Sequence, residues 1–334
     1  MNHSSMENDH RLPLISVVIP VYNEEENLPT LYDRLKRVCQ ELEGKADVEL
    51  IFVNDGSSDG TAGILRKLAG RDARVVLVNL SRNFGSHPAL MAGFSEARGD
   101  YIWTISGDLQ DPPELLPEYF NMARSRELDV VWGCRRSRVD PWHKKLFASI
   151  FYFWIRMLTD LPIPRKGVDN FMMSRRVVEI LLKIPEKNTM FYYIIMWMGF
   201  RQDFIDYDRG ARLAGVSKWT FRRRLKNAVD TLLTFSSFPI QLISYMGMLF
   251  FLLSVIFALY LILNYLVGEP SPGWTSTALI ISLATGIQML MLGIIGAYLW
   301  RIMDQVRGRP QVIVREVYRS AQETTSEDTP LKVT

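Results

Sequence analysis

The chain has 334 residues, 48% of them hydrophobic, and its 39 basic and 36 acidic side chains leave a formal net charge of +3. This length suits about two domains, and the small net charge implies no partner bound through bulk charge, so we expect no nucleic acid. The two cysteines, Cys39 and Cys134, form neither a metal-ligand spacing nor a disulfide framework, which fits a reducing compartment.

The first 13 residues are polar and lack the apolar segment of a signal peptide, so residues 1–13 are predicted to be a disordered leader. Four apolar, β-branched runs follow, and each leads into a polar loop and a helical pattern. The runs are residues 14–21, 48–53, 74–80 and 101–105. Strands that alternate with helices predict an α/β domain with a mainly parallel sheet, whose ligands collect at the carboxyl ends of the strands.

A fifth strand at 129–132 leads into the basic loop GCRRSRVD, and the aromatic-rich segment 142–158 follows. That segment could be a core helix or a helix that touches lipid, because Trp and Tyr favour the membrane interface. Residues 221–238 combine an arginine cluster with LLTFSSF and predict an amphipathic helix on the inner leaflet.

Two long segments, 240–267 and 274–300, contain no charged residue. Each exceeds the roughly 20 residues needed to cross a bilayer, so two transmembrane helices are predicted, with a buried soluble hairpin as the alternative. Basic residues flank the pair of segments and are missing from the connection GEPSPG, which predicts both termini in the cytoplasm. The predicted division is therefore a catalytic domain at 14–220, a juxtamembrane helix at 221–238, two transmembrane helices within 239–302 and a cytoplasmic tail at 303–334.

The strand ends carry the residues that suggest chemistry. Asp55 lies in VNDGSSDGT, and Asp108 and Gln110 lie in SGDLQD, immediately before a Pro-Pro-Glu helix start. A single turn of Asp and Gly is usually only a turn. Two such turns on successive units of one parallel sheet suggest a nucleotide site, in which one acidic residue contacts base or ribose and another holds a divalent cation on the diphosphate.

The motifs PVYNEEENLP, VNDGSSDGT, LSRNFGSHPALMAGF and GDLQDPPE, in this order, resemble the family 2 inverting glycosyltransferases with a GT-A fold. RNFG, DLQDPPE, the later GVSKW and two C-terminal apolar segments are similar to the polyprenyl-phosphate glycosyltransferases. That group contains dolichol-phosphate mannose synthase and bacterial undecaprenyl-phosphate glucosyl- and aminoarabinosyl-type transferases. The resemblance covers about residues 14–310.

The resemblance implies a Rossmann-like GT-A domain that binds a UDP- or GDP-linked sugar. The implied donor-binding residues are Pro20, Tyr22, Glu24, Asp55, Ser106, Gly107 and Asp108. Ser106 departs from the family's Asp-X-Asp pattern, which removes one carboxylate from the metal or ribose shell. Asp108 and Gln110 would hold Mg²⁺ or Mn²⁺ with the donor diphosphate, since magnesium is often bound by one or two carboxylates plus substrate phosphates. We expect weaker metal binding in the absence of donor.

The implied acceptor is a polyprenyl phosphate at the cytoplasmic membrane face. Asp169 falls where the family has an acceptor-facing aspartate, and we assign it orientation or base function, with an ordinary surface-loop aspartate as the alternative. Asp108, as the metal ligand, is the other predicted catalytic residue. The cations available for the two phosphates, with one hydroxyl, are Arg135, Arg136, Arg138, Arg212, Ser217 and Lys218. Similar proteins form oligomers, so a small homo-oligomer is expected.

The leading hypothesis is therefore inverting transfer of one sugar to polyprenyl phosphate for cell-envelope glycan modification. A processive polysaccharide synthase would be expected to carry a Gln-X-X-Arg-Trp motif and more apolar segments, which this sequence lacks. A catalytically impaired scaffold or sugar-lipid flippase component is the second alternative, and the Ser106 departure favours it. A transferase with a soluble acceptor is the third, and the two apolar segments argue against it.

Overall fold

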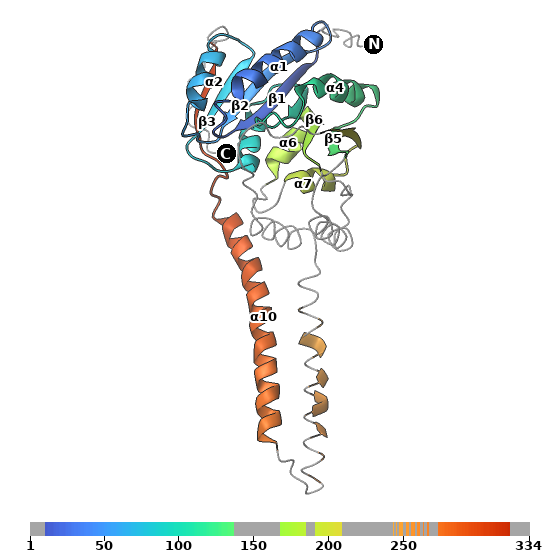
Figure 1. The fold of residues 1–334 in the computed structure, drawn as a ribbon. Coiled ribbons are helices and arrows are strands. Elements are labelled where there is room, and N and C mark those ends of the chain that lie inside the picture. Colours follow the sequence, from blue (N-terminus) through green and yellow to red (C-terminus); the bar gives the residue numbers. More distant parts are fainter. Residues whose placement is uncertain are drawn as a thin grey trace, which may run out of the picture.

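The computed structural model describes residues 11–136, 168–184, 191–208 and 273–320, together with separate positions between 243 and 266. Within these residues one sheet of eight strands runs in the order β7-β5-β6-β4-β1-β2-β3-β8 (Figure 1). The strands are β1 (Leu14–Val21), β2 (Asp47–Asn54), β3 (Val75–Leu80), β4 (Tyr101–Thr104), β5 (Val130–Arg135), β6 (Asn170–Ser174), β7 (Gln202–Tyr207) and β8 (Val314–Arg319).

The strand directions confirm a mainly parallel sheet. β1 pairs in parallel with β2 and β4, β2 with β3, and β5 with β7. β6 is antiparallel to β4 and β5, and β8 is antiparallel to β3. The carboxyl ends of the parallel strands therefore meet at one edge of the sheet, which is where such folds bind their ligands.

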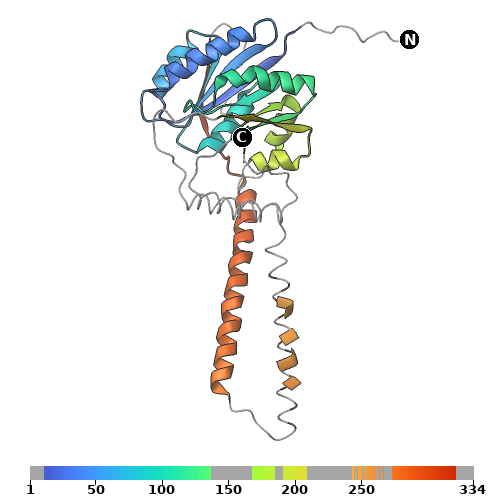
Figure 2. The same ribbon diagram turned by 45° about the vertical axis from the view of Figure 1, so that its right-hand side comes forward.

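Helices cover both faces of the sheet because its strands are apolar on both sides. One face packs against α1 (Leu28–Glu41), α2 (Thr61–Ala69) and α4 (Leu116–Ser125), which follows the short 3₁₀ helix η1 (Pro113–Leu115). The other face packs against α3 (Ser86–Glu96), α6 (Arg175–Lys183) and α7 (Phe191–Trp197). Figure 2 shows α1 and α4 on the same side of the sheet.

The predicted tail at 303–334 contains a strand. Within it, Val314–Arg319 forms β8 and pairs with β3. This strand covers an edge that would otherwise leave backbone groups unpaired. The helix of 142–158 and the juxtamembrane helix of 221–238 lie outside the described residues, as does most of the leader.

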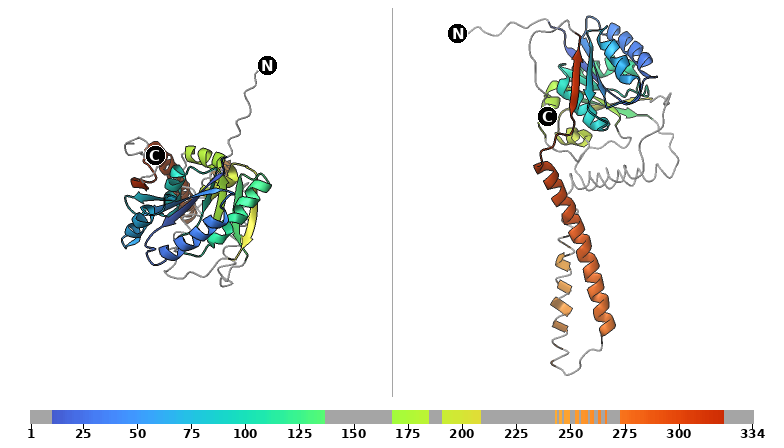
Figure 3. Two further views of the ribbon diagram at one scale, coloured as in Figure 1. Left: turned by 90° about the horizontal axis from the view of Figure 1, so that it is seen from above. Right: turned by 90° about the vertical axis from the view of Figure 1, so that its left-hand side faces the viewer.

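The long helix α10 (Trp274–Val306) projects away from the sheet (Figures 1 and 3). Its portion Ala284–Val306 has a mean hydropathy of 1.4 and is long and apolar enough to cross a membrane, and none of it is buried. Described positions between 243 and 266 are helical and lie beside α10, where a Cβ on Gly247 would be 3.5 Å from the Met291 methyl carbon. Among the described residues α10 supplies the single candidate span, and the predicted span at 240–267 lies partly outside them.

Candidate active site

The loops that follow β1 and β2 are bonded to each other at the carboxyl edge of the sheet. The Asn23 backbone N–H donates to Ser57 Oγ at 3.0 Å, and the Ser58 N–H donates to Asn23 Oδ1 at 2.9 Å. One residue further on, the Glu24 N–H donates to Thr61 Oγ1 at 3.0 Å. Asn23 has a φ of 54°, a left-handed conformation that Asn tolerates better than most residues. The two loops therefore form one surface.

Of the predicted donor residues on this surface, Pro20, Tyr22 and Glu24 are all partly exposed at the end of β1. Glu24 accepts a hydrogen bond from Asn27 Nδ2 at 2.7 Å, which fixes the carboxylate at the start of α1. The structure thus brings these three residues to the edge of the sheet where a ligand would bind.

Asp55 anchors a third loop. Its buried carboxylate accepts hydrogen bonds from the backbone N–H groups of Phe84 at 2.7 Å and Gly85 at 2.9 Å. These groups precede α3, so the negative charge also lies at the positive end of a helix. Gly56 has a φ of 66°, and a Cβ there would lie 2.4 Å from the carbonyl carbon of Arg82. The loop of residues 81–85 is therefore held directly against the end of β2.

The turn after β4 packs against the end of β1. A Cβ on Gly107 would lie 2.7 Å from Val21 Cγ1 and 3.2 Å from the Pro20 carbonyl oxygen, so a larger residue would push the turn away. The structure thus brings the predicted residues of 106–108 together with those of β1. Leu109, at the end of this turn, has a φ of 59°, an uncommon conformation for a residue other than glycine.

Asp108 is 4% exposed and is oriented within its own turn. Its Oδ1 accepts hydrogen bonds from Ser106 Oγ at 2.7 Å and from the Gln110 backbone N–H at 3.2 Å. Ser106 therefore serves as a hydrogen-bond donor to Asp108 at the position where the family pattern places a second carboxylate.

The metal prediction rests on the oxygens of Asp108 and Gln110. The described part of the chain contains no group of three or more His, Cys, Asp or Glu side chains that could hold a metal ion. One carboxylate and one amide oxygen nevertheless suit Mg²⁺, which keeps several waters and binds substrate phosphates. The donor set therefore fits a metal that arrives with a diphosphate better than a metal held by the protein alone.

Asp169 is paired with Arg135. The guanidinium Nε and Nη2 donate to the two carboxylate oxygens, and the side chains are 25% and 13% exposed for Arg135 and Asp169 respectively. Burial disfavours the charged form of Arg135, but the hydrogen bonds to Asp169 outweigh this and raise the pKa of Arg135. The Asp169 N–H also donates to the Gly133 carbonyl at 3.1 Å, which ties the residue to β5. These contacts hold the Asp169 carboxylate in one orientation, and its catalytic role stays a prediction.

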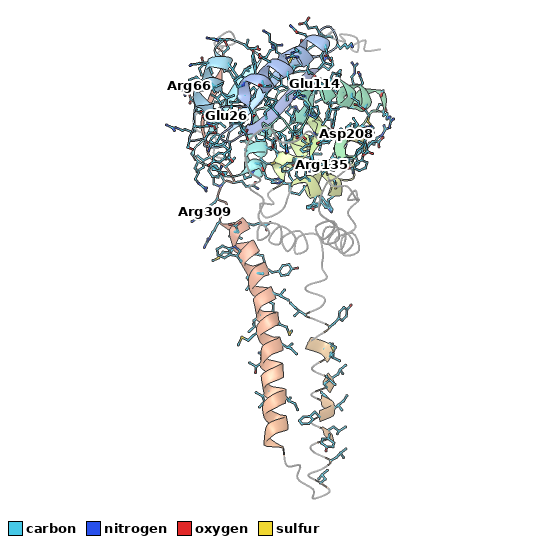
Figure 4. All side chains as sticks on the ribbon, in the orientation of Figure 1. Glu26, Arg66, Glu114, Arg135, Asp208 and Arg309 are labelled. Atoms are coloured by element: carbon cyan, nitrogen blue, oxygen red, sulfur yellow. The ribbon has the colours of Figure 1, made fainter. Side chains whose placement is uncertain are left out.

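The other predicted cations are less well defined. Arg136 is exposed and lies 3.5 Å from Asp208, and Figure 4 shows Arg135 and Asp208 in the same part of the domain. Four residues predicted to bind phosphate lie outside the described residues: Arg138, Arg212, Ser217 and Lys218.

Two contacts near the site were not predicted from the sequence. Tyr207, the last residue of β7, donates to Asp111 Oδ1 at 2.6 Å, and both residues are buried. Buried Tyr119 donates to Asn170 Oδ1, next to Asp169. Asp111 belongs to the GDLQDPPE motif noted in the sequence. The residues around Tyr207 do not indicate that it bonds to Asp111.

An ion pair between Arg34 and Glu114 holds the end of the GDLQDPPE motif. Arg34 of α1 donates to both carboxylate oxygens of Glu114, with Nε at 2.9 Å and Nη2 at 2.6 Å. Glu114 lies in η1, three residues after Asp111, so this pair holds the start of the following helix against α1. Glu114 and Arg135 are both labelled in Figure 4.

One family model and several known proteins are similar to this chain. The family model described as "Glycosyl transferase family 2" matches residues 16–206. An uncharacterized glycosyltransferase from Synechocystis sp. is 38% identical over 91% of this chain and 95% of its own length. The bactoprenol glucosyl transferase of Shigella phage SfII is 34% identical over 91% of this chain and 98% of its own, and that of phage SfV is 34% identical over 90% and 98%.

Among solved structures, glucosyl-3-phosphoglycerate synthase from Mycobacterium tuberculosis, in complex with Mn²⁺, UDP and its product, is similar to 67% of this chain and 80% of that chain. Its sequence identity is 21% and its TM-score is 0.43. Because the identity and the TM-score are this low, no role of any residue follows from the similarity.

Proposed function

The chain belongs to glycosyl transferase family 2 and is a glycosyl transfer enzyme, and from that premise we propose that it moves one sugar from a nucleotide donor to a polyprenyl phosphate. Transfer inverts the anomeric centre and takes place at the cytoplasmic face of a membrane. Relatives that match nearly the whole chain are named bactoprenol glucosyl transferases, which makes a glucosyl donor the first to test.

One observation carries the donor half of the proposal. The Asp108 turn packs directly against the end of β1, so the buried carboxylate and the partly exposed Tyr22 and Glu24 share one edge of the sheet. A nucleoside would lie along the ends of β1 and β2, and its diphosphate would reach Asp108 and Gln110. A divalent cation, Mg²⁺ or Mn²⁺, bound there with the diphosphate would neutralise the leaving group.

The acceptor half rests on the chemistry of a phosphate monoester. Its second pKa is about 6, so its oxygen is already largely anionic at neutral pH and needs no strong base. The protein must instead orient that oxygen and balance the charge of two phosphates. Both oxygens of Asp169 are occupied by Arg135, which suits a fixed orienting pair better than a proton acceptor. Arg136 and the basic residues beyond it are proposed to contact phosphate.

The helix α10 supports the proposed membrane attachment, because its apolar surface is exposed rather than packed in a core. A second span at 240–267 would run beside it, which the 3.5 Å distance from a Cβ built on Gly247 to the Met291 methyl carbon supports. An apolar acceptor tail would then enter the bilayer next to the domain. The oligomeric state stays a prediction.

The test is incubation of the purified protein with labelled nucleotide sugars, Mg²⁺ or Mn²⁺ and undecaprenyl phosphate. Labelled, organic-extractable glycolipid is expected, and NMR of the product should show an inverted anomeric centre. Asp108→Asn, which keeps the shape of the side chain, should abolish product formation. Asp33→Asn, at an exposed aspartate of α1 outside the proposed donor contacts, serves as a matched acidic control. If no donor yields glycolipid, the proposed function is wrong.

A further inference from the structure

A row of polar side chains connects β8, the strand that follows the candidate membrane helix, with the proposed donor site. Glu316 of β8 lies opposite Asn79 of β3, and Asn79 lies opposite Asn54 of β2. Cross-strand neighbours of this kind have their side chains on one face of the sheet and within contact distance. The row therefore runs from the edge of the sheet to the residue that precedes Asp55.

Hydrogen bonds connect every member of the row. Asn79 Nδ2 donates to Glu316 Oε2 at 3.3 Å, and Asn54 Nδ2 donates to Asn79 Oδ1 at 2.9 Å. Asn54 Oδ1 then accepts from the Ser57 backbone N–H at 3.1 Å. Ser57 Oγ in turn accepts from the Asn23 N–H at 3.0 Å, which reaches the loop after β1.

Glu316 and the Ser57 backbone N–H fix the direction of this row from its two ends. An amide side chain can present either its oxygen or its nitrogen to a neighbour, and the surrounding network decides between them. Asn54 and Asn79 are 4% and 8% exposed, so water cannot readily replace a lost partner. A carboxylate at 316 can only accept, so it draws the Asn79 nitrogen toward β8 and leaves the Asn79 oxygen to face Asn54. That choice in turn leaves the Asn54 oxygen to accept from Ser57.

A second contact from the same segment reaches the neighbouring loop. The Ser81 N–H donates to the Ile313 carbonyl at 3.0 Å, just before the loop whose Phe84 and Gly85 N–H groups bind Asp55. Val312 is buried against the core on the side of α3. The segment after α10 therefore contacts the loop of residues 81–85 directly and reaches the loop of residues 55–58 through Asn79 and Asn54.

We propose that Glu316 is a positioning residue for the nucleotide donor, acting through Asn79 and Asn54 on the loop of residues 55–58. This inference rests on the proposed function. It makes the C-terminal strand β8 a support of the donor site rather than part of a separate tail. The residue does not touch the donor itself. Its effect is to keep the Ser57 turn in the conformation that binds the nucleoside.

The test compares three variants of the full-length protein. Glu316→Ala removes the acceptor, Glu316→Gln keeps an amide oxygen for Asn79, and Arg66→Ala removes only the exposed ion pair of Arg66 with Glu316 at 2.7 Å. Affinity for UDP and for GDP with Mg²⁺ is measured by calorimetry. Backbone hydrogen exchange of residues 54–58 is measured without ligand, which reports on the Ser57 N–H independently of activity.

Glu316→Ala should weaken binding of the nucleotide about 3- to 10-fold, the size expected when the neutral hydrogen bonds of Asn54 with Asn79 and Ser57 are weakened, and should speed exchange at 54–58. It should leave the KM for polyprenyl phosphate unchanged. Glu316→Gln should recover part of the affinity, because the Gln amide can still present its oxygen to Asn79, and Arg66→Ala should keep the full affinity. Unchanged affinity in Glu316→Ala, or an equal loss in Arg66→Ala, overturns the proposal. A wild-type protein that binds neither nucleotide would instead count against the proposed function, while the exchange data would still decide whether Glu316 holds the turn.

Discussion

Removal of one hydroxyl group at the end of β7 should measurably destabilise the catalytic domain. Tyr207 donates to Asp111 at 2.6 Å, and the two residues are 4% and 1% exposed. A hydrogen bond to a buried charged group contributes about 1.5–3 kcal/mol, because its loss leaves the charge with fewer partners. For a domain of this size, about 1 kcal/mol lowers Tm by about 2–4 °C, so Tyr207→Phe should lower Tm by about 3–12 °C.

The assay is thermal unfolding of the detergent-solubilised protein, followed by intrinsic fluorescence and circular dichroism. Asp111→Asn and the double variant complete a cycle, which should show coupling between the two residues rather than additive losses. Tyr32→Phe is the matched control, since Tyr32 donates to Asp72 at 2.8 Å in a more exposed place at the opposite edge of the sheet. It should lower Tm less and leave transfer activity intact. A shift below about 1 °C for Tyr207→Phe, or strict additivity in the cycle, would refute the reasoning.

Three further outcomes are expected. Asp169→Asn breaks a bidentate ion pair that orients the acceptor side. Turnover should fall by about 10-fold or more, while affinity for the nucleotide stays within about 2-fold. Wild-type turnover in this variant would remove Asp169 from the site. Ser106→Asp puts a second carboxylate where a hydroxyl now donates to Asp108, so calorimetry should show tighter Mn²⁺ binding without donor, and unchanged binding would mean that the carboxylate was never limiting. Burial alone would raise the pKa of Asp72, but hydrogen bonds from Arg74 outweigh it and the pKa lies at about 2. The folded-state pKa is thus depressed, so the stability that Asp72 contributes is complete above about pH 4 and is lost as pH falls toward 2. Asp72→Asn should therefore flatten the decline of Tm over that interval, and a decline as steep as in the wild type would contradict the assignment.

The pairing of Arg135 with Asp169 bears on whether this enzyme needs a general base. An aspartate whose two oxygens both accept from one guanidinium is fixed in place, and its charge is already compensated. Such a group is suited to holding an arginine toward a phosphate. The acceptor in the proposed reaction brings its own anionic oxygen, so an orienting pair is sufficient.

Several features followed from the sequence alone because they depend on neighbouring residues. The apolar runs at 14–21 and 48–53 have the β-branched composition of buried strands, and they form β1 and β2. The parallel sheet follows from their alternation with helices, and this order places Asp55 and Asp108 at one edge. The motifs at those strand ends were sufficient to identify the family.

Tertiary structure alone decided the contacts between distant segments. The pattern of VREVYR does not reveal that β8 pairs with β3, because its partner lies more than 200 residues earlier in the chain. The same holds for the bonds of Tyr207 with Asp111 and of Asn79 with Glu316. Local sequence determines which residues can form strands, turns and charged groups. The order of strands in the sheet then determines which polar side chains meet, since a buried polar group must find its partner wherever the chain brings one.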